Sequence, residues 1–107
     1  MVNRILVIKD EALDGLHGEI LYHRLNTSEK FASTMKIDFM QRVDSILPNP
    51  YIYPECRFLP TKTQIYRNIV WGNYLIIYRV KKEIVEVLGV FHTKQKPAKI
   101  KLVKKKQ

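Results

Sequence analysis

The chain has 107 residues, of which 46% are hydrophobic and 27% charged, and 19 lysines and arginines against 10 acidic residues give it a net charge of +9. This length is typical of a single globular domain, residues 1–107, and no apolar run approaches the roughly 20 residues of a membrane span, which excludes a transmembrane protein. The single cysteine, Cys56, excludes an internal disulfide framework and fits a reducing cytoplasm, where we expect the protein.

The first part of the chain predicts a strand followed by a helix. Residues 3–8 are rich in Ile, Leu and Val and are typical of a short strand. Asp10 is placed to cap a helix over residues 11–25, in which apolar residues recur along one stripe.

A second helix follows almost at once. Asn26 and Glu29 have the spacing of a capping box, although Thr27 or Ser28 could serve as the cap instead. Pro48 ends the helix because it pushes the residue before it out of the α region. The residues that recur at helical spacing, and that we expect to face the core, are Phe31, Met35, Phe39, Val43 and Ile46.

The second half of the sequence changes to strand periodicity. A connection over residues 48–63 carries four of the five prolines, and alternating patterns then predict strands over 64–70, 74–80 and 84–92. The order β-αα-βββ predicts a two-layer α+β domain, in which a helical hairpin packs on an antiparallel meander sheet.

The register of the last hairpin decides which side chains share a face. If Lys81 and Lys82 form a two-residue loop, Tyr78 pairs with Val85, and the face under the helices is almost wholly apolar. That face would carry Ile76, Tyr78, Val85, Val87 and Phe91. The opposite, open face would carry Arg79 and His92.

The position of Arg67 depends on the preceding turn. A three-residue loop over residues 71–73 places Arg67 opposite Ile77 on the open face, whereas a two-residue loop, Gly72-Asn73, places it opposite Tyr78 under the helices. An unpaired buried guanidinium is costly, so we expect the open face. The open face would then be a basic concave surface formed by Arg67, Arg79 and His92, with Lys62 and Lys94 at its rim.

Positive charge is the strongest signal in the composition. We expect about residues 98–107 to form a basic, solvated tail, but removing its five lysines still leaves a surplus of four positive charges. A field of this sign attracts polyanions and acidic proteins. The three histidines lack metal-ligand spacing, so we expect neither a metal nor a cofactor.

With this order of elements, the segment "YRNIVWGNYLIIYRVKKEIVEVLGVFHTKQKP", residues 66–97, resembles the RelE/ParE toxin superfamily of bacterial type II toxin–antitoxin modules, which includes plasmid stabilisation proteins. The resemblance covers essentially the whole chain. It implies a RelE-like fold and a small basic toxin. It also implies a cognate acidic antitoxin that folds around the toxin, with a heterotetramer as one assembly.

The branches of this superfamily imply different targets. RelE-like members are metal-independent endoribonucleases that enter the ribosomal A site and cleave mRNA, with basic side chains that stabilise the charge on the phosphate. ParE-like members inhibit DNA gyrase and need no such constellation. We expect ribosome-dependent mRNA cleavage, with a gyrase inhibitor or a degenerate toxin as the alternatives.

Carried over by position, the resemblance implies catalytic roles for four residues. Arg67 matches the arginine that contacts the scissile phosphate in nuclease members, and Arg79 matches a less constant basic position. His92 falls where some members keep a catalytic histidine or tyrosine, and Glu55 is a weaker candidate base. No tyrosine follows Tyr78, so the aromatic residue that some members stack on the substrate base is missing. The expected nucleic-acid contacts are Lys62, Arg67, Arg79, Lys94 and Lys96.

Overall fold

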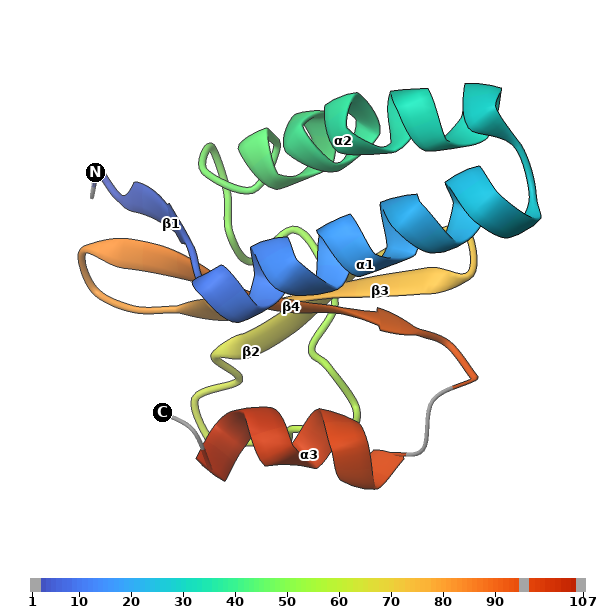
Figure 1. The fold of residues 1–107 in the computed structure, drawn as a ribbon. Coiled ribbons are helices and arrows are strands. Elements are labelled where there is room, and N and C mark those ends of the chain that lie inside the picture. The colour runs from blue at the N-terminus through green and yellow to red at the C-terminus, as the bar shows by residue number, and fades with distance from the viewer. Residues whose placement is uncertain (1–2, 95–96, 106–107) are drawn as a thin grey trace.

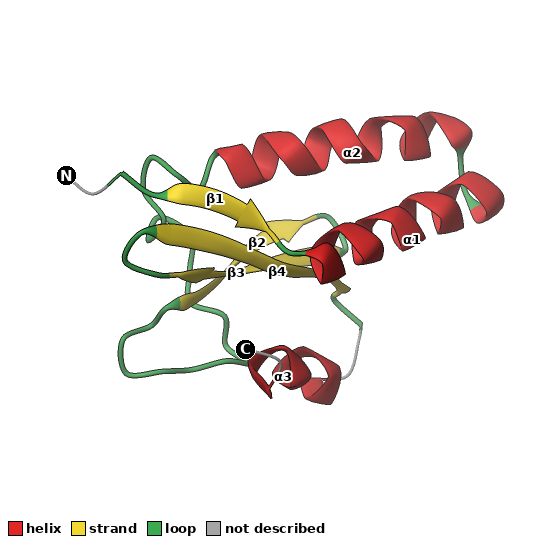
Figure 2. Cartoon of the chain, turned by 60° about the vertical axis from the view of Figure 1, so that its left-hand side comes forward, coloured by secondary structure: helices red, strands yellow, loops and turns green. Residues whose placement is uncertain are grey.

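Helices cover both faces of one mixed sheet in the computed structural model, which describes residues 3–94 and 97–105, without the side chains of 104 and 105. The elements are β1 (Ile5–Ile8), α1 (Asp10–Asn26), α2 (Glu29–Asp44), β2 (Tyr66–Trp71), β3 (Tyr74–Val80), β4 (Ile84–His92) and α3 (Pro97–Lys105). The helical hairpin of α1 and α2 lies on one face of the sheet and α3 on the other (Figures 1 and 2). The predicted α+β fold is confirmed, and α3 adds a third layer.

The strand order in the sheet is β1-β4-β3-β2. The last three strands form the predicted antiparallel meander, and β1 joins its edge in parallel with β4. No helix in the described part of the chain is both long and apolar enough to cross a bilayer.

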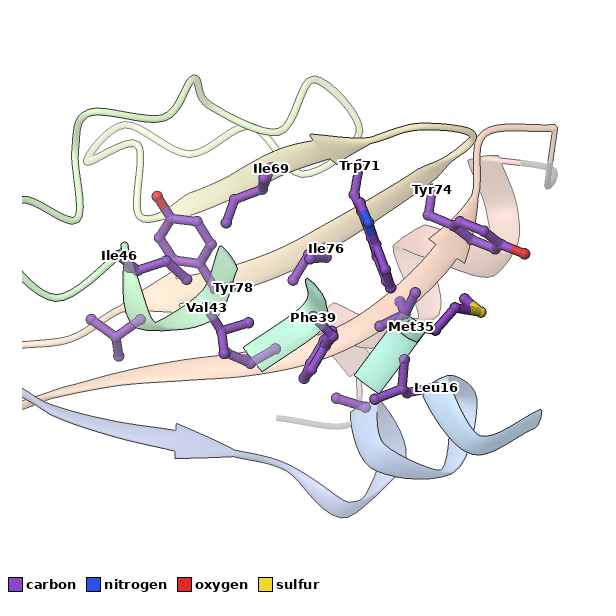
Figure 3. Close-up of a cluster of buried hydrophobic side chains, with 14 of the residues drawn as sticks. Leu16, Met35, Phe39, Val43, Ile46, Ile69, Trp71, Tyr74, Ile76 and Tyr78 are labelled. Carbon is purple, nitrogen blue, oxygen red and sulfur yellow. The ribbon is translucent and has the colours of Figure 1, made fainter. Parts of the chain in front are cut away.

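The helix α2 supplies most of the inward-facing helical side chains. Its cap is Ser28, whose side chain accepts a hydrogen bond from the backbone N–H of Phe31 at 3.2 Å. The predicted stripe is confirmed for Met35, Phe39, Val43 and Ile46, which are all buried against the sheet (Figure 3). Phe31 is the exception: it is 45% exposed and lies against the ring of His23 instead.

The helix α1 presents a narrower buried stripe. Ala12 and Leu16 are buried, whereas Leu21 and Leu25 near its C-terminus are exposed. Asp10 is the first helical residue and not the cap, a position that Lys9 takes without a side-chain hydrogen bond. The predicted Asp10 cap is therefore wrong by one residue.

The hairpin between β3 and β4 turns at a different position from the one that the sequence predicted. Val80 pairs with Val85, and Lys81 donates its backbone N–H to the carbonyl oxygen of Ile84 at 2.9 Å. Tyr78 consequently pairs with Val87 and not with Val85. The predicted two-residue register is wrong, but a shift of two residues preserves the faces, so Tyr78 still points toward the helices (Figure 3).

A bulge in β4 then changes which side chains of this strand face the helices. Ile77 pairs with Gly89 while its neighbour Tyr78 pairs with Val87, which leaves Leu88 as an extra residue in β4. Every side chain beyond an extra residue moves to the other face. Phe91, predicted under the helices, packs on the α3 side, whereas the pairing of His92 with Tyr74 places it on the helix side.

The turn between β2 and β3 also differs from the favoured prediction. Trp71 pairs with Tyr74 across a two-residue turn, in which Gly72 has a φ of 57°. A φ in this range is the left-handed region that glycine adopts without steric cost. Arg67 therefore lies opposite Tyr78, on the helix side of the sheet.

Residues 97–105 form the helix α3, where a solvated tail was predicted from about residue 98. Ile100 of α3 is 1% exposed. It joins a second buried cluster on the sheet face opposite α1 and α2, made of Cys56, Leu59, Tyr66, Ile77, Leu88 and Ile100. The physical reason is that α3 covers apolar side chains that the hairpin of α1 and α2 cannot reach.

Candidate functional site

The predicted surface of Arg67, Arg79 and His92 is not formed. Arg67 and His92 lie on the helix side of the sheet, whereas Arg79 lies on the α3 side beside Glu86. Arg67 and His92 are also far apart along the sheet. Their partners in β3, Tyr78 and Tyr74, are separated by four residues, or about 13 Å of strand. The two-residue turn between β2 and β3 and the bulge in β4 are the physical reasons for this correction.

Arg67 lies on the helix side of the sheet without the cost of burying an unpaired guanidinium. Its Nη1 donates hydrogen bonds to the carbonyl oxygens of Tyr51 at 3.2 Å and Tyr53 at 2.9 Å, and its Nε donates to the carbonyl oxygen of Gln64 at 3.0 Å. The loop between α2 and β2 thus solvates the guanidinium with backbone oxygens. Because these acceptors are neutral, Arg67 keeps its full positive charge.

Arg79 forms an ion pair with Glu86 directly across β3 and β4. Its Nε donates to Glu86 Oε1 at 3.1 Å, and Lys81 Nζ lies 3.2 Å from the same oxygen. Burial alone would raise the pKa of Glu86, but the hydrogen bonds from Arg79 and Lys81 outweigh burial and hold that pKa below its usual value. The charge of Arg79 is therefore already neutralised within the fold.

His92 lies beside a hydrogen-bonded cluster that the sequence did not reveal. The ring of Tyr74 is edge-on to the ring of His92, with centroids 5.4 Å apart. The Tyr74 hydroxyl donates to Glu19 Oε2 at 2.8 Å and lies 2.6 Å from His23 Nε2. A cavity of about 760 Å³ borders these side chains.

The hydrogen bonds in this cluster specify which groups carry protons. Because the Tyr74 hydroxyl gives its proton to Glu19, it must accept one from His23 Nε2. Burial raises the pKa of Tyr74, and Glu19 raises it further, so the hydroxyl stays protonated. His92 accepts a hydrogen bond at Nδ1 from the backbone N–H of Lys94 at 3.1 Å. No local pattern predicts this cluster, since Tyr74 lies more than 50 residues from Glu19 and His23 along the chain.

The remaining predicted residues are Glu55, Lys62, Lys94 and Lys96. Glu55 Oε2 accepts a hydrogen bond from the backbone N–H of Thr61 at 3.3 Å, and its backbone bridges to Arg67. Lys62 and Lys94 are exposed, whereas Lys96 lies outside the described residues. Their contacts with nucleic acid stay predictions. Within the described ranges, no group of three or more His, Cys, Asp or Glu side chains could hold a metal ion.

Comparisons with known proteins place this arrangement in context. Residues 6–97 match the family model described as "ParE toxin of type II toxin-antitoxin system, parDE". A solved structure, "Chromosomal ParDE TA system from P. aeruginosa", matches with a TM-score of 0.71 and 14% sequence identity, over 84% of this chain and 96% of that chain. At this identity the likeness concerns the fold. The comparison with curated protein sequences finds no match.

Proposed function

Since the chain belongs to the family of ParE toxins of type II toxin–antitoxin systems, we propose that it arrests growth by binding and inhibiting DNA gyrase, without cleaving mRNA. Gyrase inhibition is the activity of ParE-like members of the superfamily that the sequence resembles. A gyrase inhibitor acts through a binding surface, so it does not require basic groups and a proton-transfer residue to converge on one phosphate.

The observation that carries this proposal is the separation of Arg67 from Arg79. Cleavage of an mRNA phosphodiester requires cationic groups that converge on the charge that develops on the phosphate in the transition state. Here the two arginines lie on opposite faces of the sheet. The guanidinium of Arg79 is also engaged by Glu86. Reuniting the two arginines would require a change of register throughout β2 and β3, which a substrate cannot induce by side-chain motion.

The family implies an antitoxin as a partner. We propose that this antitoxin is acidic, because the toxin carries a net charge of +9 and complementary charge speeds association and excludes wrong partners. We keep the heterotetramer as the proposed assembly of the two proteins. Size-exclusion chromatography with light scattering on the co-expressed pair would measure its mass.

Two assays on the purified toxin test the choice of target. We expect the toxin to inhibit gyrase-catalysed supercoiling and to leave mRNA on programmed ribosomes intact. His92→Ala should change gyrase inhibition by less than about twofold, because a binding mechanism needs no proton-transfer group at that position. Cleavage of mRNA that depends on Arg67 and His92 would overturn the proposal. Failure in both assays would identify a degenerate toxin.

A further inference from the structure

Two guanidinium groups lie over one exposed tyrosine ring. The Cζ atom of Arg67 is 4.9 Å from the centroid of the Tyr51 ring, and that of Arg4 is 5.9 Å from it. These distances are within the range of cation–π contacts. The three residues come from the segment before β1, the loop after α2, and β2, so only the folded chain brings them together. We call this group the Arg–Tyr cluster.

The Arg–Tyr cluster is held in place by hydrogen bonds to the backbone. Arg67 is held by three carbonyl oxygens, as described above, and Arg4 Nε donates to the carbonyl oxygen of Lys81 at 2.8 Å. The backbone N–H of Tyr51 donates to Asn49 Oδ1 at 3.2 Å. The ordering entropy of these side chains is therefore lost on folding, so a partner that binds them does not bear that cost again.

The positive charge of the Arg–Tyr cluster has no internal counterion among the described residues. Arg24 and Arg79 form ion pairs with Glu29 and Glu86. In contrast, the hydrogen bonds of Arg4 and Arg67 go to carbonyl oxygens, with one long contact from Arg67 to the side-chain amide of Gln64. Two uncompensated guanidinium groups beside an exposed aromatic ring match the residue types that dominate binding energy at protein interfaces.

We propose that the Arg–Tyr cluster binds an acidic segment of the protein that this toxin inhibits, a segment in which a carboxylate is followed by an apolar side chain. The carboxylate would lie between Arg4 and Arg67, where charge-assisted hydrogen bonds are strong. The apolar side chain would cover Ile52, which follows Tyr51 in the chain and is 67% exposed. The identity of the partner, DNA gyrase, rests on the proposed function.

A protein segment fits this surface better than a nucleic acid. Single-stranded nucleic acids bind aromatic residues by stacking bases on the ring face. A base could stack on the guanidinium-covered face of Tyr51 only by displacing an arginine from its hydrogen bonds. The exposed Ile52 would also face phosphate groups, whereas it complements an apolar side chain of a protein.

Binding to the gyrase holoenzyme, measured by biolayer interferometry against salt concentration, tests the proposal. We expect Arg4→Gln to raise Kd about 3- to 10-fold and the double variant Arg4→Gln/Arg67→Gln to raise it about 30-fold or more, with a shallower salt dependence. Ile52→Asp should raise Kd about 10-fold. Because Ile52 is exposed, this substitution leaves the buried core unchanged. The matched control is Arg57→Gln, which removes an exposed guanidinium that lies 4.7 Å from the ring centroid of Phe58, outside the cluster.

The outcomes separate the two levels of the proposal. Thermal unfolding first checks that the cluster variants are folded. If the wild-type toxin inhibits gyrase but the folded cluster variants bind gyrase like Arg57→Gln, the Arg–Tyr cluster is not the binding surface and the proposed function stands. If the wild-type toxin does not bind gyrase, the proposed function and the partner named here both fall. If the variants instead lose binding to duplex DNA alone, with gyrase binding unchanged, the ligand is nucleic acid and the assignment to a protein segment is overturned.

Discussion

Arg79 and Glu86 face each other across β3 and β4 and form an ion pair in which both Nε and Nη2 donate to one carboxylate oxygen. Glu86 is 7% exposed, and Lys81 from the connecting loop adds a second cation. Arg79 stands opposite Glu86 only in the observed register, because the predicted register would pair Arg79 with Ile84. The ion pair and the observed register therefore support each other.

Loss of the Glu86 charge should destabilise the protein. We expect Glu86→Gln to lower the free energy of unfolding at pH 7 by about 1–3 kcal/mol, because it leaves a partly buried Arg79 without its counterion. Urea denaturation followed by circular dichroism measures this. Glu29→Gln is the control, since its ion pair with Arg24 is exposed and should contribute less than about 0.5 kcal/mol.

The same ion pair predicts a direction of pH dependence. The pKa of Glu86 is lower in the folded protein than its unfolded value of about 4.3, so the stability it contributes is fully present above that pH and is lost as the pH falls through the folded value. The stability difference between wild type and Glu86→Gln should therefore shrink below pH 4. A difference that stays constant from pH 7 to pH 3 would contradict the assignment.

The Tyr74 hydroxyl should contribute to stability through its two partners. Tyr74→Phe removes the donor to Glu19 and the acceptor for His23 while the ring stays in the core. We expect the free energy of unfolding to fall by about 1–3 kcal/mol, because two part-buried polar groups lose their partner. Tyr53→Phe, which removes an exposed hydrogen bond to Ser45, should cost less than half as much. Equal losses in the two variants would argue against the cluster around Tyr74.

Docking of α3 can be measured through the single cysteine. Cys56 is fully buried in the same cluster as Ile100, and burial raises its thiol pKa, so labelling by a thiol reagent should be slow in the native protein. We expect Ile100→Ala to lower the free energy of unfolding by about 2–4 kcal/mol and to accelerate labelling of Cys56. Leu102→Ala, at a position that is 49% exposed, should leave the labelling rate nearly unchanged. Identical rates in the two variants would contradict the docking of α3 over Cys56.

The bulge in β4 should be sensitive to the side chain at residue 89. A Cβ atom at Gly89 would lie 2.6 Å from the ring of Phe91, so Gly89→Ala requires that ring to move. We expect a loss of about 1–3 kcal/mol. Gly18→Ala is the matched control. Gly18 lies within α1, and apart from its chain neighbours and the backbone of its own helix no atom lies within 4 Å of the added Cβ, so the change should stabilise the protein by about 0.5–1 kcal/mol. Urea denaturation measures the free energy of unfolding of both variants, which should fall for Gly89→Ala and rise for Gly18→Ala. A stabilised Gly89→Ala would contradict the close contact.

The sequence by itself determined the elements from β1 to β4 and most of the buried faces, but it did not indicate α3. Strands over residues 74–80 and 84–92 have the predicted bounds, and Met35, Phe39 and Val43 face the core as their spacing indicated. This succeeds because helical and strand periodicities are local properties: each apolar residue specifies a face relative to its near neighbours.

Only the tertiary structure decided where the functional candidates lie. One extra residue in β4 moved His92 to the helix side, and a two-residue turn moved Arg67 there as well. A period of two indicates which side chains share a face, but it does not specify turn length or a bulge, because those depend on the free energy of pairing between distant strands. The carbonyl oxygens that make the position of Arg67 acceptable come from residues 51, 53 and 64, and only folding brings residues 51 and 53 beside it.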